Sequence, residues 1–176
     1  MTAMDESGAR ADMLPISRAR PDYPHWDVML ALILDAFTYM EGRIDPPSSA
    51  HRLTVEAMAA QAASGMVWVI EDGGRPIACA FGKLSGEALY LGKIAVAQGY
   101  RGRGLARRLI EKAASEARAK GRAWLELESR IELAENHAAF GAMGFVKTGE
   151  TAHPGYDQST SITMRRPIGR RGGVAP

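Results

Sequence analysis

At residues 99–104, three glycines and two arginines separate an apolar run from the long charged segment that follows. Gly99, Gly102 and Gly104 permit backbone conformations that other residues avoid, and they let another molecule approach the main chain closely. A turn of this kind directly before a helix gathers free backbone N–H groups at the positive end of the helix dipole, an arrangement that binds anions. The segment therefore predicts a phosphate-binding turn, with a plain helix cap carrying solvated arginines as the alternative.

Two common phosphate motifs do not fit this turn. A dinucleotide-binding fingerprint would need a further glycine where Arg107 stands. A P-loop would need Gly-Lys followed by Ser or Thr, and Gly104 is followed by Leu105. The phosphate would thus be held by a different type of turn.

A pair of carboxylates provides a second candidate for chemistry. In the segment WLELES, the side-chain period of a strand places Glu126 and Glu128 on one face and Leu125 and Leu127 on the other. A carboxylate held on a strand can act as a general base. It can equally form a structural ion pair with a neighbouring arginine or lysine, and both interpretations stay open.

The elements expected to position these residues alternate between helices and strands. Apolar spacing predicts helices at 23–41, 54–64, 103–120 and 132–143. Apolar and alternating runs predict strands at 14–19, 66–71, 77–84, 88–96, 123–129, 144–150 and 159–166. A strand, a long helix and another strand form a parallel crossover, so we expect a single-domain α/β fold with a mixed central sheet flanked by helices. We expect the domain to span 13–166, with a disordered N-terminal end at 1–12 and a disordered basic tail at 167–176.

The bulk composition narrows the class of protein. A chain of 176 residues with 46% hydrophobic content suits one soluble domain, and its net charge of +2 gives no reason to expect nucleic acid as a partner. The first residues lack the pattern of a secretory signal, and the most apolar helix is too short to span a bilayer. The single cysteine, Cys79, lies in an apolar run. We therefore expect a cytoplasmic protein with no membrane partner, either a monomer or a homodimer.

The glycine turn resembles that of a known family. Arg101, Gly104 and Ala106 match the Arg/Gln-x-x-Gly-x-Gly/Ala signature of the GNAT superfamily of acyl-coenzyme A dependent N-acyltransferases. As in that family, the preceding strand ends in an Ile-x-Val pair, here Ile94 and Val96, and the order of elements along the chain is similar. The resemblance covers most of the chain and implies the GNAT fold, in which the central sheet is mostly antiparallel.

The resemblance also implies a cofactor and the residues that bind it. The co-substrate would be acetyl-CoA, with no metal: the turn amides would hold its pyrophosphate, the preceding strand would pair with its pantetheine arm, and the arginine side chains would add charge at the rim. The cofactor-binding residues that it implies are Ile94, Ala95, Val96, Arg101, Gly102, Arg103, Gly104, Leu105, Ala106, Asn136 and Phe140.

The catalytic residues follow less directly. The segment Leu125–Glu126–Leu127 resembles the Leu-Glu-Val strand of the branch that acetylates ribosomal-protein N-termini, so Glu126 would be the base. The tyrosine that serves as the general acid in much of the family is replaced here by Phe140, which has no proton to donate. Tyr156, in the loop before the last strand, is the substitute acid that we predict, and packing at an interface is its alternative role.

The acceptor site would be formed by the N-terminal helices and the last loop. We predict Tyr39, Arg43, Asp45 and His153 as substrate-binding residues. The function expected is N-acetyltransfer from acetyl-CoA to a primary amine of a small molecule or peptide, directly within a ternary complex. The alternative is a non-catalytic acyl-CoA binding or sensor domain of the same fold. A weaker alternative, nucleic-acid binding by arginines near the C-terminus, lacks an aromatic platform beside those arginines.

Overall fold

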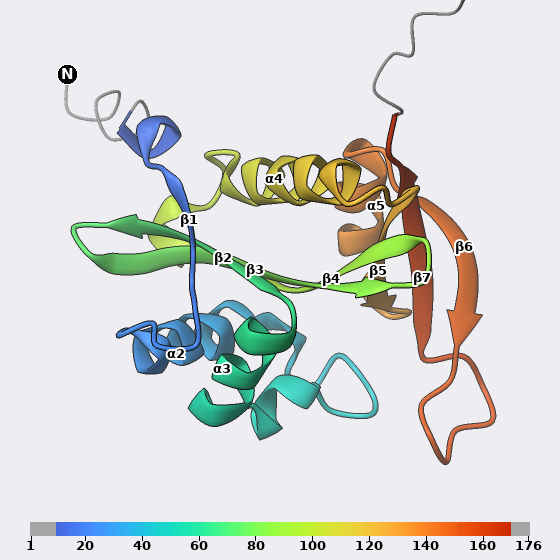
Figure 1. Cartoon of the computed structure of the whole chain (residues 1–176). Helices are drawn as coiled ribbons and strands as arrows, with labels where there is room; N and C mark the ends of the chain where they lie inside the picture. Colours follow the sequence, from blue (N-terminus) through green and yellow to red (C-terminus); the bar gives the residue numbers. More distant parts are fainter. Residues whose placement is uncertain (1–9, 170–176) are drawn as a thin grey trace, which may run out of the picture.

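The computed structural model describes residues 10–169 of the chain (Figure 1). The disordered ends expected at 1–12 and 167–176 lie outside these residues, except for 10–12 and 167–169. These two described pieces pack on the domain, because Ala11 is buried in the core and the Ile168 amide donates a hydrogen bond of 2.8 Å to the Ala123 carbonyl.

A seven-stranded sheet forms the centre of the domain, with strand order β1-β2-β3-β4-β5-β7-β6. The strands are β1 (Ile16–Arg18), β2 (Met66–Asp72), β3 (Arg75–Ser85), β4 (Ala88–Val96), β5 (Trp124–Arg130), β6 (Val146–Thr151) and β7 (Ser161–Pro167). Only β4 and β5 pair in parallel within this sheet; the other neighbours are antiparallel. The mixed, mostly antiparallel sheet expected from the sequence is confirmed, including the crossover from β4 to β5.

Helices cover both faces of this sheet (Figure 1). One face carries α4 (Leu105–Ala119) and α5 (Ala134–Ala142), and the opposite face carries α2 (Trp26–Ala36) and α3 (Val55–Ser64). Short 3₁₀ turns are η1 (Thr38–Met40), η2 (Ser49–Arg52) and η3 (Gln98–Tyr100). The loop between β6 and β7 extends toward the face that carries α2 and α3.

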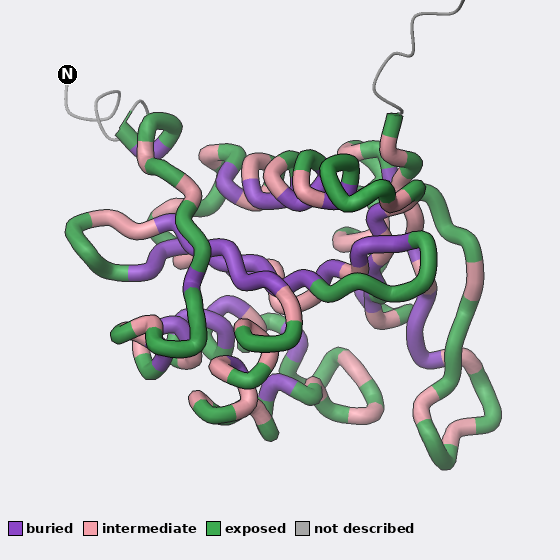
Figure 2. The backbone as a smooth tube through the Cα atoms, in the orientation of Figure 1, coloured by how far each residue is buried: buried purple, intermediate pink, exposed green. Residues whose placement is uncertain are grey.

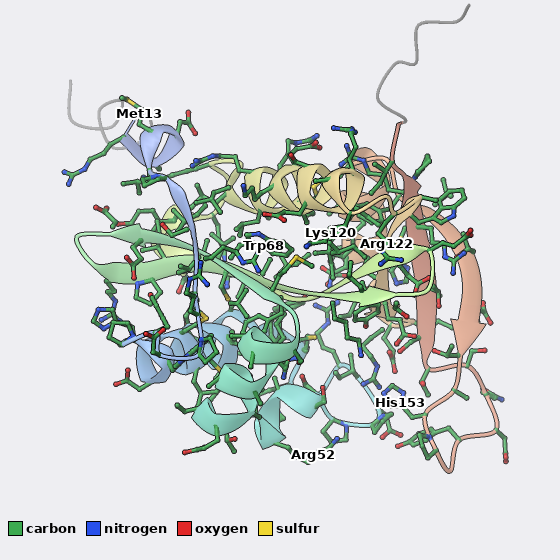
Figure 3. The ribbon with its side chains drawn as sticks, in the orientation of Figure 1. Met13, Arg52, Trp68, Lys120, Arg122 and His153 are labelled. Carbon is green, nitrogen blue, oxygen red and sulfur yellow. The ribbon has the colours of Figure 1, made fainter. Side chains whose placement is uncertain are left out.

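Side chains that alternate along the strands build two hydrophobic clusters, one on each face of the sheet, and Figure 2 shows that the central strands are largely buried. On β2, Trp68 belongs to the cluster under α4, where Figure 3 shows it between the sheet and that helix, whereas Val67 and Val69 belong to the cluster under α2 and α3. On β5, Leu125 and Leu127 are buried under α4. The alternating carboxylates of β5 consequently lie on the α2–α3 face.

The helix boundaries differ from those expected wherever a glycine or a tight turn intervenes. Helix α2 begins at Trp26 and ends at Ala36, and the chain then tightens into η1 rather than continuing as one helix from 23 to 41. Helix α4 begins at Leu105 rather than Arg103, because its N-cap Gly104 has a φ of +74°. A residue in that left-handed conformation cannot continue a right-handed helix.

A bulge in β4 changes which side chains face α2 and α3. Phe81 pairs with Gly92 and Cys79 pairs with Ala95, so two residues of β4, Lys93 and Ile94, lie opposite one residue of β3. Lys93 takes a φ of +49° at this point. Simple alternation from Leu91 would place Lys93 under α4, but the bulge turns its side chain to the α2–α3 face.

Candidate functional site

A groove lies where the end of β4 meets the N-terminus of α4 and the C-terminus of α2. It has an empty volume of about 770 Å³, including space open to solvent. Its lining residues are Ala36, Phe37, Tyr39, Ile94, Ala95, Val96, Tyr100, Arg101, Gly102, Gly104, Leu105, Ala106 and Asn136. Nine of the eleven residues predicted to bind the cofactor line this groove, so segments that lie far apart in the sequence converge there.

The turn at the start of α4 presents backbone amides to the groove. Gly102 and Gly104 have φ values of +75° and +74°, and a Cβ atom placed on either would meet no atom within 4 Å. The amides of Gly102, Gly104, Leu105 and Ala106 donate no hydrogen bond to any residue from 10 to 169. Several backbone donors at a helix N-terminus are thus left without a partner among residues 10–169 and belong to residues that line the groove, an arrangement that can hold a phosphate group.

The strand before the turn offers an open edge. Parallel pairing between β4 and β5 runs from Ala88–Trp124 to Leu91–Leu127 and stops there. Beyond Leu91, β4 continues to Val96 while pairing only with β3 within the described sheet. The edge of β4 at Ile94–Val96 can therefore accept an extended ligand as an added strand.

Three of the predicted cofactor residues take positions that differ from those expected. Arg101 is exposed, and its guanidinium donates to the carbonyls of Val96 (3.4 Å) and Ala36 (3.5 Å) and so joins two walls of the groove. Arg103 lies outside the lining, and its guanidinium carbon is 5.2 Å from the centre of the Tyr100 ring. Phe140 also lies outside the lining, with its ring 5.9 Å from that of Phe145.

A tyrosine and an asparagine meet across the groove. Asn136, on α5, donates a hydrogen bond of 2.8 Å to the hydroxyl oxygen of Tyr39, on η1. This hydroxyl accepts a hydrogen bond from Asn136 and donates none to a residue in the described part of the chain. Its own proton is therefore available to another acceptor. Tyr39, which was predicted as an acceptor-binding residue, lines the same groove as Ile94 and Ala95.

Glu126 is held in an ion pair on the α2–α3 face. The Arg165 Nε donates to Glu126 Oε2 at 2.6 Å, and the Glu126 side chain is 17% exposed. Glu126 is also the register partner of Tyr90 on β4. Burial raises the pKa of Tyr90 to about 12, with further contributions from the carboxylates of Glu128 and Glu126. The ion pair considered from the sequence is present, and it fixes the orientation of the predicted base.

The other predicted residues form polar contacts outside the groove lining. Tyr156 donates its hydroxyl proton to Asp45 Oδ1 at 2.7 Å, a bond that raises the pKa of Tyr156, and neither residue lines the groove. Arg43 pairs with Glu135 at 2.5 Å. His153 Nδ1 lies 2.5 Å from the Thr160 hydroxyl, within its own loop, and Figure 3 shows it away from the sheet. None of these four predicted acceptor or acid residues lines the groove.

A second pocket on the α2–α3 face was not expected from the sequence. It has an empty volume of about 500 Å³ and borders the bulge of β4. Its lining residues are Gln61, Ser64, Phe81, Gly82, Lys83, Tyr90, Gly92 and Lys93. The only local signal for this pocket was a single lysine, Lys93, which follows Gly92 in the otherwise apolar segment of strand β4.

Cys79 and the terminal arginines take structural positions. Burial raises the pKa of the Cys79 thiol to about 12, so it stays protonated, and its sulfur lies 3.7 Å from the carbonyl oxygen of Lys93. Of the C-terminal arginines, Arg165 pairs with Glu126 and Arg166 with Glu111, while Arg170 and Arg171 lie outside the described residues.

Residues 10–169 contain no group of three or more His, Cys, Asp and Glu side chains arranged to hold a metal ion. Among the helices of this same part of the chain, none combines the length and apolar character needed to cross a bilayer.

Comparison with known families decides the classification. The sequence model of the Acetyltransferase (GNAT) family matches residues 26–145, which include β4, the glycine turn, α4 and β5. The chain belongs to the GNAT family. None of the curated protein sequences compared with it matches.

Solved structures of GNAT proteins share the fold. The ribosomal-protein-S18-alanine N-acetyltransferase of Escherichia coli is 24% identical, with a TM-score of 0.64 over 93% of this chain and 99% of that chain. The IAA acetyltransferase of Bacillus cereus is 19% identical, with a TM-score of 0.62 over 88% and 99%. The PaiA N-acetyltransferase of Thermoplasma acidophilum, solved with coenzyme A, is 10% identical, with a TM-score of 0.72 over 88% and 98%.

Proposed function

We propose that this GNAT protein is an N-acetyltransferase that moves an acetyl group from acetyl-CoA directly to a primary amine within a ternary complex. The observation that carries the proposal is the groove, which combines four backbone amides that donate to no residue from 10 to 169 with an edge of β4 that is unpaired in the described sheet. We propose that the amides from Gly102 to Ala106 hold the pyrophosphate and that Ile94–Val96 pairs with the pantetheine arm. The thioester would then lie near the bulge of β4.

Transfer requires that the amine lose a proton and that the leaving sulfur gain one. The neutral amine attacks the thioester carbonyl carbon, a C–N bond forms, the C–S bond breaks, and the acetyl group remains on nitrogen. Glu126 lies on the face that carries the bulge and is oriented by Arg165. We propose that Glu126 takes the amine proton through an intervening water molecule.

Two tyrosines are candidates for the proton donor to the thiolate. Tyr39 lines the groove, as Ile94 does, and its hydroxyl donates a hydrogen bond to no described residue. Tyr156 is bonded to Asp45 outside the groove lining, and that bond must break before its proton can be given to sulfur. We therefore favour Tyr39 as the acid and assign Tyr156 to holding the last loop on Asp45.

For the acceptor, we propose only the class of primary amines. One structural neighbour is named for the alanine of ribosomal protein S18 and another for IAA. A peptide N-terminus and a small-molecule amine are therefore both acceptors to be tested. Cys79 is buried as a protonated thiol, which suits the reducing cytoplasm in which we propose that the protein works.

The proposal is tested first by donor binding and then by transfer. Calorimetric titration with acetyl-CoA, free coenzyme A and ATP should show binding of both coenzyme A species and weaker binding of ATP, since ATP lacks the pantetheine arm. Thiol release should then be followed with a panel of primary amines and short peptides. Absence of acetyl-CoA binding by folded protein would remove the donor site. Donor binding without release for any amine would favour the alternative of a non-catalytic acyl-CoA sensor.

A further inference from the structure

The pocket at the β4 bulge contains two lysines that converge without a carboxylate partner. Lys93 Nζ donates to the Gln61 side-chain oxygen at 3.1 Å and lies 5.4 Å from the centre of the Phe81 ring. Lys83 Nζ lies 5.7 Å from the centre of the Tyr90 ring. In the described part of the chain, neither ammonium group lies within ion-pair distance of an Asp or Glu.

This concentration of positive charge is energetically unfavourable in the empty pocket. Burial lowers the pKa of Lys93, and the nearby charge of Lys83 lowers it further. Placing a cation where water is partly excluded costs free energy unless an opposite charge is present. The hydrogen bond to Gln61 satisfies one of the three N–H donors of Lys93, which leaves two for an incoming anion.

The bulge explains why this charge faces the pocket. Because of the bulge, the Lys93 side chain lies on the α2–α3 face of the sheet, where it reaches Gln61 on α3. Gly92, immediately before it, has no side chain, and a Cβ atom there would meet only the Tyr90 ring, at 3.7 Å. The missing side chain beside Phe81 leaves the floor of the pocket open.

A row of register partners connects the pocket to the proposed catalytic carboxylate. Lys83 pairs with Tyr90, Tyr90 with Glu126, and Glu126 with Arg165, so one polar residue from each of β3, β4, β5 and β7 lies on the same face. On β4, the residues that line the groove begin at Ile94, directly after Lys93, which lines the pocket. Glu126 itself lines neither hollow, but it lies beside Tyr90, a lining residue of the pocket, and two strands away from Lys83.

We infer that the acceptor of this GNAT protein carries an anionic group in addition to its primary amine, with Lys83 and Lys93 binding the anion while the amine lies toward Glu126. The inference rests on the proposed acetyltransfer. The shared chemistry is that of a carboxylate or phosphate tethered to an amine, as in an amino acid or an aminoalkyl phosphate. Lysine binds such anions through charge-assisted hydrogen bonds.

The test compares amines that differ only in the anionic group. Thiol release from acetyl-CoA is measured with β-alanine, γ-aminobutyrate and δ-aminovalerate against propylamine, butylamine and pentylamine, and with phosphoethanolamine as the phosphate arm. We expect a higher kcat/KM for at least one anionic amine than for its neutral partner. Preference for the amino acids over phosphoethanolamine identifies a carboxylate, and the reverse identifies a phosphate. Equal rates across every matched pair would overturn the inference while leaving the acetyltransferase proposal intact.

Matched variants assign the preference to the pocket. Lys93→Met should raise KM for the anionic amine by roughly 10- to 100-fold, the effect of losing one hydrogen bond to a charged group, and should leave the neutral amine unchanged. Lys112→Met removes a lysine on α4, on the other side of the sheet, where it pairs with Glu116, and should change neither rate. A Lys93→Met variant that keeps the preference would refute the assignment.

A binding measurement separates failure of this inference from failure of the acetyltransferase proposal. Titration of the coenzyme A complex with N-acetyl-β-alanine, N-acetyl-γ-aminobutyrate and N-acetylphosphoethanolamine requires no turnover. Even if no amine releases thiol, binding of one of these anions that weakens roughly 10-fold or more in Lys93→Met supports the anion site. Gly92→Val, which fills the pocket without changing its charge, should weaken the same binding. No binding of any of the three, or equal binding by wild type and Lys93→Met, overturns the inference.

Discussion

Replacing Gly104 with aspartate, and in parallel with asparagine, tests the anion site at the start of α4. Gly104 has a φ of +74°, and a Cβ atom placed there meets no atom within 4 Å, so either side chain fits. Asn and Asp tolerate the left-handed conformation better than most residues, and they share its cost. The two variants have nearly the same shape and differ in one negative charge, so their comparison isolates electrostatics.

The size of the effect follows from the distance between charges. A carboxylate on residue 104 would lie roughly 4 Å from a phosphate held by the neighbouring amides, which gives a repulsion of about 1 kcal/mol in water and about 4 kcal/mol at the effective dielectric of a protein surface. We therefore expect Gly104→Asp to bind acetyl-CoA roughly 5- to 1000-fold more weakly than Gly104→Asn.

Calorimetry at low and moderate salt measures this difference, and thermal unfolding confirms that both variants are folded. The gap between the two dissociation constants should shrink as salt rises, because added ions screen the repulsion. Equal affinity of the aspartate and asparagine variants at low salt would show that the pyrophosphate does not lie at the α4 N-terminus.

Three further predictions concern catalysis and charge. Glu126→Gln should reduce turnover by roughly 10²- to 10⁴-fold with unchanged acetyl-CoA affinity; unchanged kcat would exclude it as the base. Tyr39→Phe should slow thiol release at saturating amine more than Tyr156→Phe, and the opposite order would return the acid role to Tyr156. Because burial and Lys83 lower the pKa of Lys93, binding of N-acetyl-β-alanine to the coenzyme A complex should be strongest below that pKa and decline above it, at a lower pH than for an ordinary lysine. Lys93→Met should flatten this pH profile, and a profile identical to that of wild type would contradict the prediction.

Much of the fold could be predicted because its signals are local. The alternation of leucine and glutamate in β5 assigned one face to the core and the other to polar residues, and both leucines are buried. The order of β4, a long amphipathic helix and β5 predicted the parallel crossover, which is present. Element ends were less accurate where backbone conformation decided them, as at Gly104, because composition alone does not give φ.

The candidate site was predictable in part for the same reason. The donor groove uses residues that lie close together in the sequence, Ile94–Val96, Arg101, Gly102 and Gly104–Ala106, and their spacing is visible there. The partners of the polar side chains were not visible. Tyr39 meets Asn136 across 97 positions of sequence, and Glu126 meets Arg165 across 39. Such pairs depend on how loops and strands are brought together, and no short pattern records that.

The sequence by itself determined the turn that can hold a phosphate, the faces of most strands and the order of the elements, because each depends on residues within one or two turns of chain. Only the tertiary structure decided where Lys93 points. Its direction depends on one extra residue of β4 relative to β3, and a shift of one residue in register moves a side chain to the opposite face of a sheet. The donor groove was thus determined locally, whereas the charge of the neighbouring pocket was determined by strand pairing.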